Sequence, residues 1–126
     1  PAMMWKFHNA KVNGQDSVML FGDGSPTREF LHVDDLADAL VFLMNNYNDS
    51  DHINIGSGDE HTIAELADIV SRVVGYKGDI IWDTTKPNGT PRRKLDISKL
   101  TNLGWGASIP LDKGLKDTYD WFINNV

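Results

Sequence analysis

Apolar residues recur at helical spacing in five stretches of the chain, and the clearest stretch follows Thr62. Thr62 and Glu65, three positions apart, match a capping box at its start. Gly75 ends the stretch, because glycine readily adopts the left-handed conformation that follows many helices. Its apolar stripe consists of Ile63, Leu66, Ala67, Val70, Val73 and Val74. The apolar spacing predicts helices over residues 2–12, 34–46, 62–74, 98–103 and 111–124.

The other helices are predicted from shorter apolar faces and from residues that begin or end helices. Met4 and Phe7 share one face of the first helix, and Asn13-Gly14 follows it as a stop signal. Asp34 is the expected N-cap of the second helix. The expected apolar faces are Leu36, Ala39, Leu40 and Leu43 in the second helix, and Leu115, Tyr119 and Phe122 in the last.

Short apolar segments between turn residues predict strands over residues 17–21, 28–33, 52–55 and 79–83. A turn is predicted at 22–26, where two Gly and one Pro leave few regular conformations, and an irregular loop at 84–91. This alternation indicates an α/β (α+β) fold with a small mixed sheet of short strands and about five helices. We expect residues 1–126 to form a single domain, because this length fits one hydrophobic core.

Composition argues against several kinds of partner. With a net charge of −6 at pH 7, the chain lacks the surplus of Lys and Arg on which broad binding to nucleic acid or to anionic membranes depends. It has no cysteine, so it offers neither a disulfide nor a Cys-based zinc site. No apolar run matches a membrane span, and no signal-peptide pattern opens the chain. We therefore expect a cytoplasmic protein that binds neither nucleic acid nor membrane.

Three patterns that suggest chemistry have structural interpretations. Gly56-Ser-Gly58-Asp-Glu-His61 lies between a predicted strand and a helix, as dinucleotide-binding loops do, but its third position is His61 rather than Gly. We interpret it as a plain turn. The pair Asp34-Asp35 is interpreted as helix capping, because adjacent residues at a helix start diverge in direction. The four histidines lack the spacing of metal ligands, so no metal site is predicted.

Cations beside bent loops are the most informative pattern. Arg28 follows the Gly- and Pro-rich turn, Arg92-Arg93-Lys94 follows a Gly-Thr-Pro bend, and Lys6 lies on the first helix. An arginine fork can hold two oxygens of a phosphate at once. A solvated basic surface explains isolated lysines well, but it explains three consecutive cations in an acidic chain less well. On these residues alone, both interpretations remain open.

The segments Arg28-Glu-Phe-Leu-His-Val-Asp-Asp35 and Lys86-Pro-Asn-Gly-Thr-Pro-Arg92, in this order, resemble the C-terminal substrate domain of the GDP-L-fucose synthases. These enzymes are NADP-dependent epimerase/reductases of the extended short-chain dehydrogenase family, and the similarity extends along the whole chain. The resemblance implies that a GDP-sugar faces Lys6, Phe21, Arg28, Asn88 and Arg93. It also implies three departures: Phe21 replaces the usual Trp, Asn88 the usual Asp and Arg93 the usual Lys.

The resemblance further implies that the catalytic groups lie outside this chain. Short-chain dehydrogenases use a Tyr four residues before a Lys, so that the cation lowers the pKa of the phenol for proton transfer. Four positions after Tyr47, Tyr76 and Tyr119 stand Asp51, Ile80 and Ile123. We therefore predict no catalytic residue and no cofactor in this chain. In the complete family enzyme, NADP(H) is bound by another part, the Rossmann half. The fold expected here lacks that half.

Three functions remain open. The first is a domain or fragment that binds a GDP-sugar weakly and is not catalytic alone. The second is half of a split enzyme completed by a separate NADP-binding chain. The third is a degenerate folded remnant that serves in protein–protein contact. The resemblance implies that the strands at 28–33 and 52–55 lie against the missing half, so its removal would leave unpaired strand edges and uncovered apolar surface. We therefore expect a homo-oligomer, most simply a two-fold dimer that pairs an exposed edge or buries the uncovered face.

Overall fold

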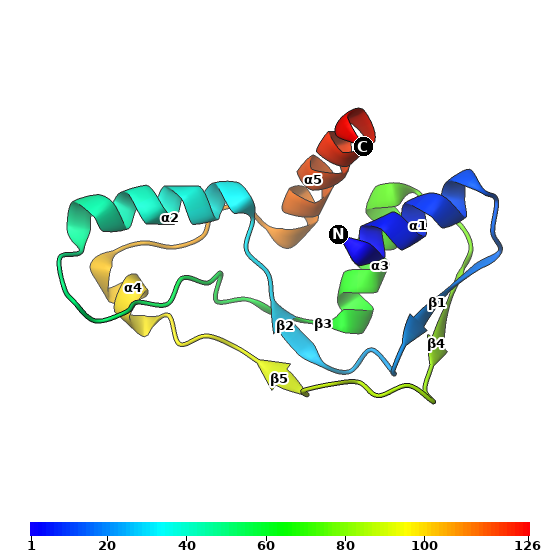
Figure 1. Cartoon of the computed structure of the whole chain (residues 1–126), viewed down its shortest axis with the longest axis horizontal. Helices are drawn as coiled ribbons and strands as arrows, with labels where there is room; N and C mark the ends of the chain where they lie inside the picture. The colour runs from blue at the N-terminus through cyan, green and yellow to red at the C-terminus, as the bar shows by residue number, and fades with distance from the viewer.

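The computed structural model describes all of residues 1–126. Five helices and five short strands form two ends joined by a narrow middle, as Figure 1 shows. In chain order the elements are α1 (Ala2–Val12), β1 (Ser17–Phe21), β2 (Thr27–Glu29), α2 (Val33–Asn46), β3 (Glu60–Thr62), α3 (Ile63–Val74), β4 (Asp79–Asp83), β5 (Arg92–Arg93), α4 (Ser98–Leu103) and α5 (Leu111–Asn125).

The strands form two small sheets. β1 pairs in parallel with β4, from Ser17 opposite Asp79 to Phe21 opposite Asp83. In the second sheet β2 is central, with β3 antiparallel on one side and β5 parallel on the other. Five helices and small mixed sheets confirm the predicted fold class.

The larger core lies where α1, α3 and α5 pack beside β1 and β4. Phe7 of α1 and Val74 of α3 are almost completely buried in it. Tyr119 of α5 is also buried, and its hydroxyl lies 3.0 Å from Nδ1 of His8. Burial raises the pKa of Tyr119. α3 has the predicted capping box at Thr62 and its C-cap at Gly75. The predicted apolar stripe faces this core except at Ile63.

A smaller core at the other end of the molecule joins α2 to α4. Ala39 of α2 and Leu100 of α4 are fully buried, and Trp105 packs beside them. The indole Nε1 of Trp105 donates a hydrogen bond to Asp38 Oδ2 at 2.9 Å. The indole is therefore held in place by both apolar contact and a hydrogen bond.

The start of α2 differs from the prediction. Its N-cap is His32, whose Nδ1 accepts a hydrogen bond from the backbone N–H of Asp34, so the prediction of Asp34 as the cap was wrong. Asp35 is buried and accepts hydrogen bonds from the backbone N–H groups of Ser108 and Ile109. Burial by itself would raise the pKa of Asp35, but these hydrogen bonds outweigh it and lower the pKa.

The strand predictions need two corrections. Residues 52–55 form no strand, and none of their backbone groups bonds to another backbone group, because the chain places no strand beside them. β2 ends at Glu29 rather than at residue 33, and it is paired with β3 on one side and β5 on the other, so the prediction of an unpaired edge at this strand was wrong. β3 and β5 were not predicted, since elements of two or three residues are too short to show a period.

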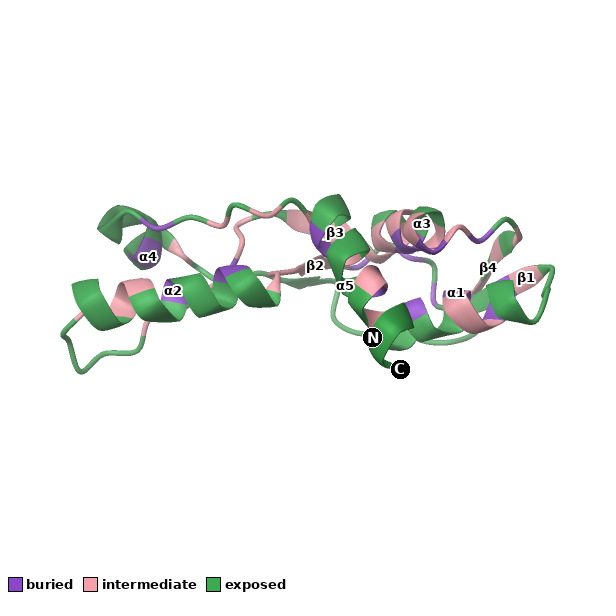
Figure 2. Cartoon of the chain, turned by 90° about the horizontal axis from the view of Figure 1, so that it is seen from above, coloured by how far each residue is buried: buried purple, intermediate pink, exposed green.

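Much apolar surface is open to solvent. Only 19 of 126 residues are buried, and exposed residues predominate in Figure 2. The predicted apolar face of α2 is divided: Ala39 is buried, whereas Leu36 is 38% and Leu40 is 51% exposed. With the exposed Val33 and Met44 they form one helical stripe, which we call the α2 stripe.

Candidate functional site

Phe21, at the end of β1, presents an aromatic ring that is flanked by two ammonium groups. Lys6 Nζ lies 5.3 Å and Lys86 Nζ 5.8 Å from the ring centroid, and Phe21 is 64% exposed. Lys6 also donates a hydrogen bond to the carbonyl oxygen of Met19 at 3.0 Å, which holds α1 against β1. Lys86 comes from loop 84–91, so three distant parts of the sequence meet at this ring.

Asn88 fixes loop 84–91 to the turn after β1. Its Oδ1 accepts a hydrogen bond from the backbone N–H of Asp23 at 2.8 Å. Gly22 has φ of +84°, and a Cβ there would collide with Asn88 Oδ1, so only glycine fits. A hydrogen bond from Ser25 lowers the pKa of the neighbouring Asp23 carboxyl. The geometry therefore places Asn88 as the residue that positions this turn.

Arg28 and Arg93 lie side by side on one face of the three-stranded sheet. They are partners in the register of β2 and β5, so their side chains leave the same face, with Cβ atoms about 5 Å apart. Arg28 Nη1 donates to the carbonyl oxygen of Thr27 at 2.7 Å, and Arg93 Nη2 to Thr90 Oγ1 at 3.4 Å. A Cβ at Gly89 would lie 4.0 Å from Arg28 Nη2, so both guanidinium groups border loop 84–91.

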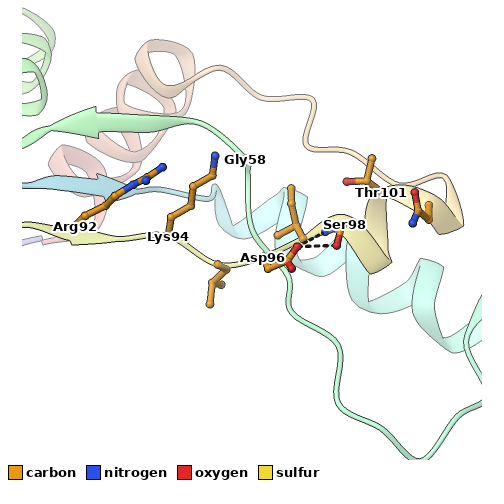
Figure 3. A pocket seen from close by; sticks show the side chains of 9 residues that line it. Gly58, Arg92, Lys94, Asp96, Ser98 and Thr101 are labelled. Atoms are coloured by element: carbon orange, nitrogen blue, oxygen red, sulfur yellow. Dashed lines mark hydrogen bonds between the residues drawn. The ribbon is translucent and has the colours of Figure 1, made fainter.

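The opposite face of the same sheet is electrically compensated. Arg92 donates two hydrogen bonds of 2.7 Å to the carboxylate of Glu60, and Lys94 Nζ lies 3.8 Å from it. The hydrogen bonds from Arg92 lower the pKa of Glu60 by favouring its ionised form. An open groove of about 720 Å³ runs from these two cations to Ser98 of α4, as Figure 3 shows. Both cations in this groove already have an anionic partner.

The structure thus brings the sequence-predicted residues to one surface around loop 84–91. Lys6 and Phe21 contact each other at one end of that surface, Asn88 lies in the loop, and Arg28 and Arg93 lie beyond it. None of the four flanking cations, Lys6, Arg28, Lys86 and Arg93, has a carboxylate within 4.0 Å.

Two residues beside this site were not predicted from the sequence. Lys86 stands within the Lys-Pro-Asn-Gly segment that the sequence singled out, but only the fold shows that it reaches the Phe21 ring. His61 is the register partner of Arg28 on β3, and its Nδ1 lies 3.6 Å from Glu65 Oε2. No sequence pattern connects His61 to Arg28, because β3 was not predicted.

An apolar groove lies between α1 and α5, away from this site. It has a volume of about 660 Å³, and 13 of its 18 lining residues are hydrophobic. Trp5 and Trp121 line it and are 48% and 62% exposed. Two large indole groups at an open groove are typical of a surface that contacts another polypeptide.

No cluster of three or more His, Asp or Glu side chains is arranged to hold a metal ion. None of the five helices combines the length and the apolar character that a membrane crossing requires.

Comparison with known proteins identifies relatives of this chain. Residues 1–56 match the model of the NAD dependent epimerase/dehydratase family. GDP-L-fucose synthase 1 of Arabidopsis thaliana is 58% identical over 126 residues, which are 100% of this chain and 39% of that protein. GDP-L-fucose synthase of Escherichia coli K12 is 44% identical over 134 residues, covering 99% of this chain and 42% of that protein.

Solved structures contain the same fold. The crystal structure of a GDP-L-fucose synthetase from Naegleria fowleri bound to NADP superposes with a TM-score of 0.93 at 29% identity. The superposition covers 99% of this chain and 40% of that one. The chain therefore spans about two-fifths of the length of the proteins that it matches.

Proposed function

Because the chain corresponds to the C-terminal part of the GDP-L-fucose synthases, we propose that it binds the nucleoside diphosphate of a GDP-sugar. Arg28 and Arg93 hold the phosphates, and the base stacks on Phe21. Lys6 holds the ring of Phe21 in place, and Asn88 holds the turn beside it. The chain is not catalytic alone in this proposal.

The observation on which the proposal rests is the set of four uncompensated cations around loop 84–91. The chain has a net charge of −6, and the neighbouring Arg92 and Lys94 share the carboxylate of Glu60 as an anionic partner. Adjacent cations without an anionic partner repel one another, and a diphosphate removes that repulsion. An exposed ring beside them gives a base a surface on which to stack.

The expected affinity is weak. A dissociation constant in the millimolar to high-micromolar range corresponds to about 4–6 kcal/mol. The site is an open surface, so a ligand loses its freedom of motion and gains contacts from one side only. The contacts are chiefly ionic, so added salt weakens them.

The test is a GDP titration followed by calorimetry or NMR. Arg28→Ala and Arg93→Ala should each weaken GDP binding by about tenfold, the loss expected for a hydrogen bond between charged groups. Arg92→Ala is the matched control: it removes the same kind of side chain from the same strand, but from the compensated face. It should leave GDP affinity unchanged within about twofold. No response to several millimolar GDP would overturn the proposal.

A second candidate function is supported by the open apolar surface. We propose that the chain also docks on a polypeptide that supplies the NADP-binding part of the family's fold, as a separate chain or as another part of a longer one. The α1–α5 groove, the α2 stripe and the unpaired backbone of residues 52–55 are its contact surfaces. The relatives' additional three-fifths of length provides a partner of this kind.

The second candidate has its own measurement. The chain alone should not oxidise NADPH in the presence of GDP-4-keto-6-deoxymannose, because proton transfer needs a Tyr–Lys pair that its sequence lacks. Mixing it with the NADP-binding part of a GDP-L-fucose synthase should give a complex, which Trp121→Glu in the groove should weaken. Lys77→Glu, outside that groove, is the control. NADPH oxidation by the chain alone would contradict the proposal that another polypeptide supplies the NADP-binding part.

A further inference from the structure

The two lysines beside Phe21 are not equivalent. Lys6 is anchored by its hydrogen bond to the carbonyl oxygen of Met19 and projects from a helix. Lys86 has no hydrogen bond and no ion pair from its side chain, and it is exposed on loop 84–91. Its ammonium group therefore has all three protons available to a ligand that reaches the ring.

We propose that Lys86 recognises the base of the bound nucleotide and selects guanine over adenine. The inference rests on the proposed nucleotide site and adds the group that determines its base preference. An ammonium group donates hydrogen bonds and accepts none. Guanine offers the acceptors O6 and N7 along one edge, whereas adenine carries an N6 amino donor where guanine has O6.

Stacking on Phe21 cannot make this choice, since every base has a flat face and stacks with little sequence preference. The phosphate-binding arginines cannot make it either, because GDP and ADP present the same diphosphate. Lys6 contributes less to selection, because its position and one of its protons are committed to Met19. Of the cations at the site, Lys86 combines a free ammonium group with a place beside the ring.

The loop that carries Lys86 is positioned for this role. Asn88, two residues further on, fixes the loop to the backbone of Asp23. Gly89 then brings the loop alongside Arg28. One short segment thus borders both the ring and the phosphate-binding Arg28, and in the proposed arrangement the diphosphate lies on Arg28 and the base lies toward Lys86.

The experiment compares GDP, inosine diphosphate and ADP in titrations of the chain at fixed salt concentration. Inosine diphosphate has the O6 of guanine but not its 2-amino group, so it isolates the carbonyl contact. The chain should bind GDP and inosine diphosphate about tenfold more tightly than ADP, the ratio expected for one good contact to a base edge. Lys86→Met, which keeps the length of the side chain, should reduce both ratios to near one.

Three control variants separate the possible results. Arg28→Ala should weaken all three nucleotides by the same factor and leave the ratios unchanged. Lys77→Met, at the opposite end of the β1–β4 pair, should change nothing. Lys86→Arg retains a donor and should retain most of the preference for GDP, which shows that loss in Lys86→Met is not a folding defect.

Each outcome bears on a different part of the argument. If no nucleotide binds the unaltered chain, the proposed function fails and the inference fails with it. If GDP binds but Lys86→Met leaves the ratio of GDP to ADP affinity unchanged, the inference alone is overturned. If inosine diphosphate behaves like ADP, the base is selected through the 2-amino group, and the assignment to Lys86 is likewise wrong.

Discussion

At the scale of single residues, the position of a charged group relative to the sheet decides what it does. Arg92 and Arg93 are adjacent in sequence, but successive residues of a strand project to opposite faces. Arg92 therefore meets Glu60, while Arg93 shares its face with Arg28. Arg92 is compensated within the chain, whereas Arg93 is available to an anion.

Asp35 gives the clearest residue-scale prediction on stability. Asp35→Asn should lower the free energy of unfolding by about 2 kcal/mol at pH 7, because a buried carboxylate that accepts two backbone hydrogen bonds becomes a neutral amide. Since the pKa of Asp35 is lowered by folding, its contribution is complete above the ordinary value of 3.8. It is lost as the pH falls through the lower pKa of the folded state.

Urea denaturation between pH 7 and pH 2.5 measures this difference. The curves for the unaltered chain and for Asp35→Asn should converge as the pH falls below 3.8. Asp34→Asn is the matched control, because Asp34 is the adjacent carboxylate and its side chain is 79% exposed. A constant gap between the curves at all pH values would show that the charge of Asp35 does not matter.

The sequence could identify which residue types form the candidate site, but not the faces from which they project. In the sequence, Arg92-Arg93-Lys94 is a single basic run, but Arg92 and Lys94 belong to the compensated face. Only the register with β2 separates them, and register depends on pairing between residues more than sixty positions apart. Lys86 was missed for the same reason, since its contact with Phe21 depends on the pairing of β1 with β4.

At the scale of elements, α3 was predicted most accurately because its signals are local. The capping box, the apolar period and the final glycine all lie within fifteen residues. Residues 52–55 show the opposite case: their apolar pattern is that of a strand, but a strand also needs a hydrogen-bonded neighbour, and this chain provides none. The tendency of a segment to form a strand can be seen in its sequence, whereas the neighbouring strand that it must pair with cannot.

Thr62→Ala tests the local account of α3. Loss of the capping hydrogen bond to the backbone N–H of Glu65 should lower the free energy of unfolding by about 1 kcal/mol. Thermal or urea unfolding followed by circular dichroism measures this loss. Ser71→Ala, in the interior of the same helix, should cost nothing or stabilise slightly, because alanine has the higher helix propensity. Equal effects of the two substitutions would argue against the cap.

The segment at 52–55 gives a prediction on hydrogen exchange. In the chain alone, the amides of Ile53, Asn54 and Ile55 should exchange within the dead time of a manual experiment, because they have no backbone acceptor. Amides of α3 should be protected under the same conditions. Adding the NADP-binding part of a GDP-L-fucose synthase should slow exchange at residues 53–55, since the proposed docking supplies a neighbouring strand. Protection in the isolated chain would show that these amides are already paired.

At the scale of the whole molecule, two small cores and a large open apolar surface predict association. The α1–α5 groove exposes Trp5 and Trp121, the α2 stripe exposes Leu40 and Met44, and a chain in water gains free energy by covering such surface. In the absence of a docking polypeptide, we expect the chain to self-associate at high micromolar concentration, most simply as a two-fold dimer.

Light scattering coupled to size-exclusion chromatography measures this association. Trp121→Glu in the groove and Met44→Glu on the α2 stripe each place a carboxylate on one of the two surfaces, so the variant that reduces the mass identifies the surface used. Lys77→Glu adds negative charge outside the groove and the stripe, and it should leave the mass unchanged. GDP at saturating concentration should not dissociate the oligomer, because Arg28 and Arg93 lie outside both apolar surfaces. A monomeric mass at high micromolar concentration would mean that the open surface does not drive self-association.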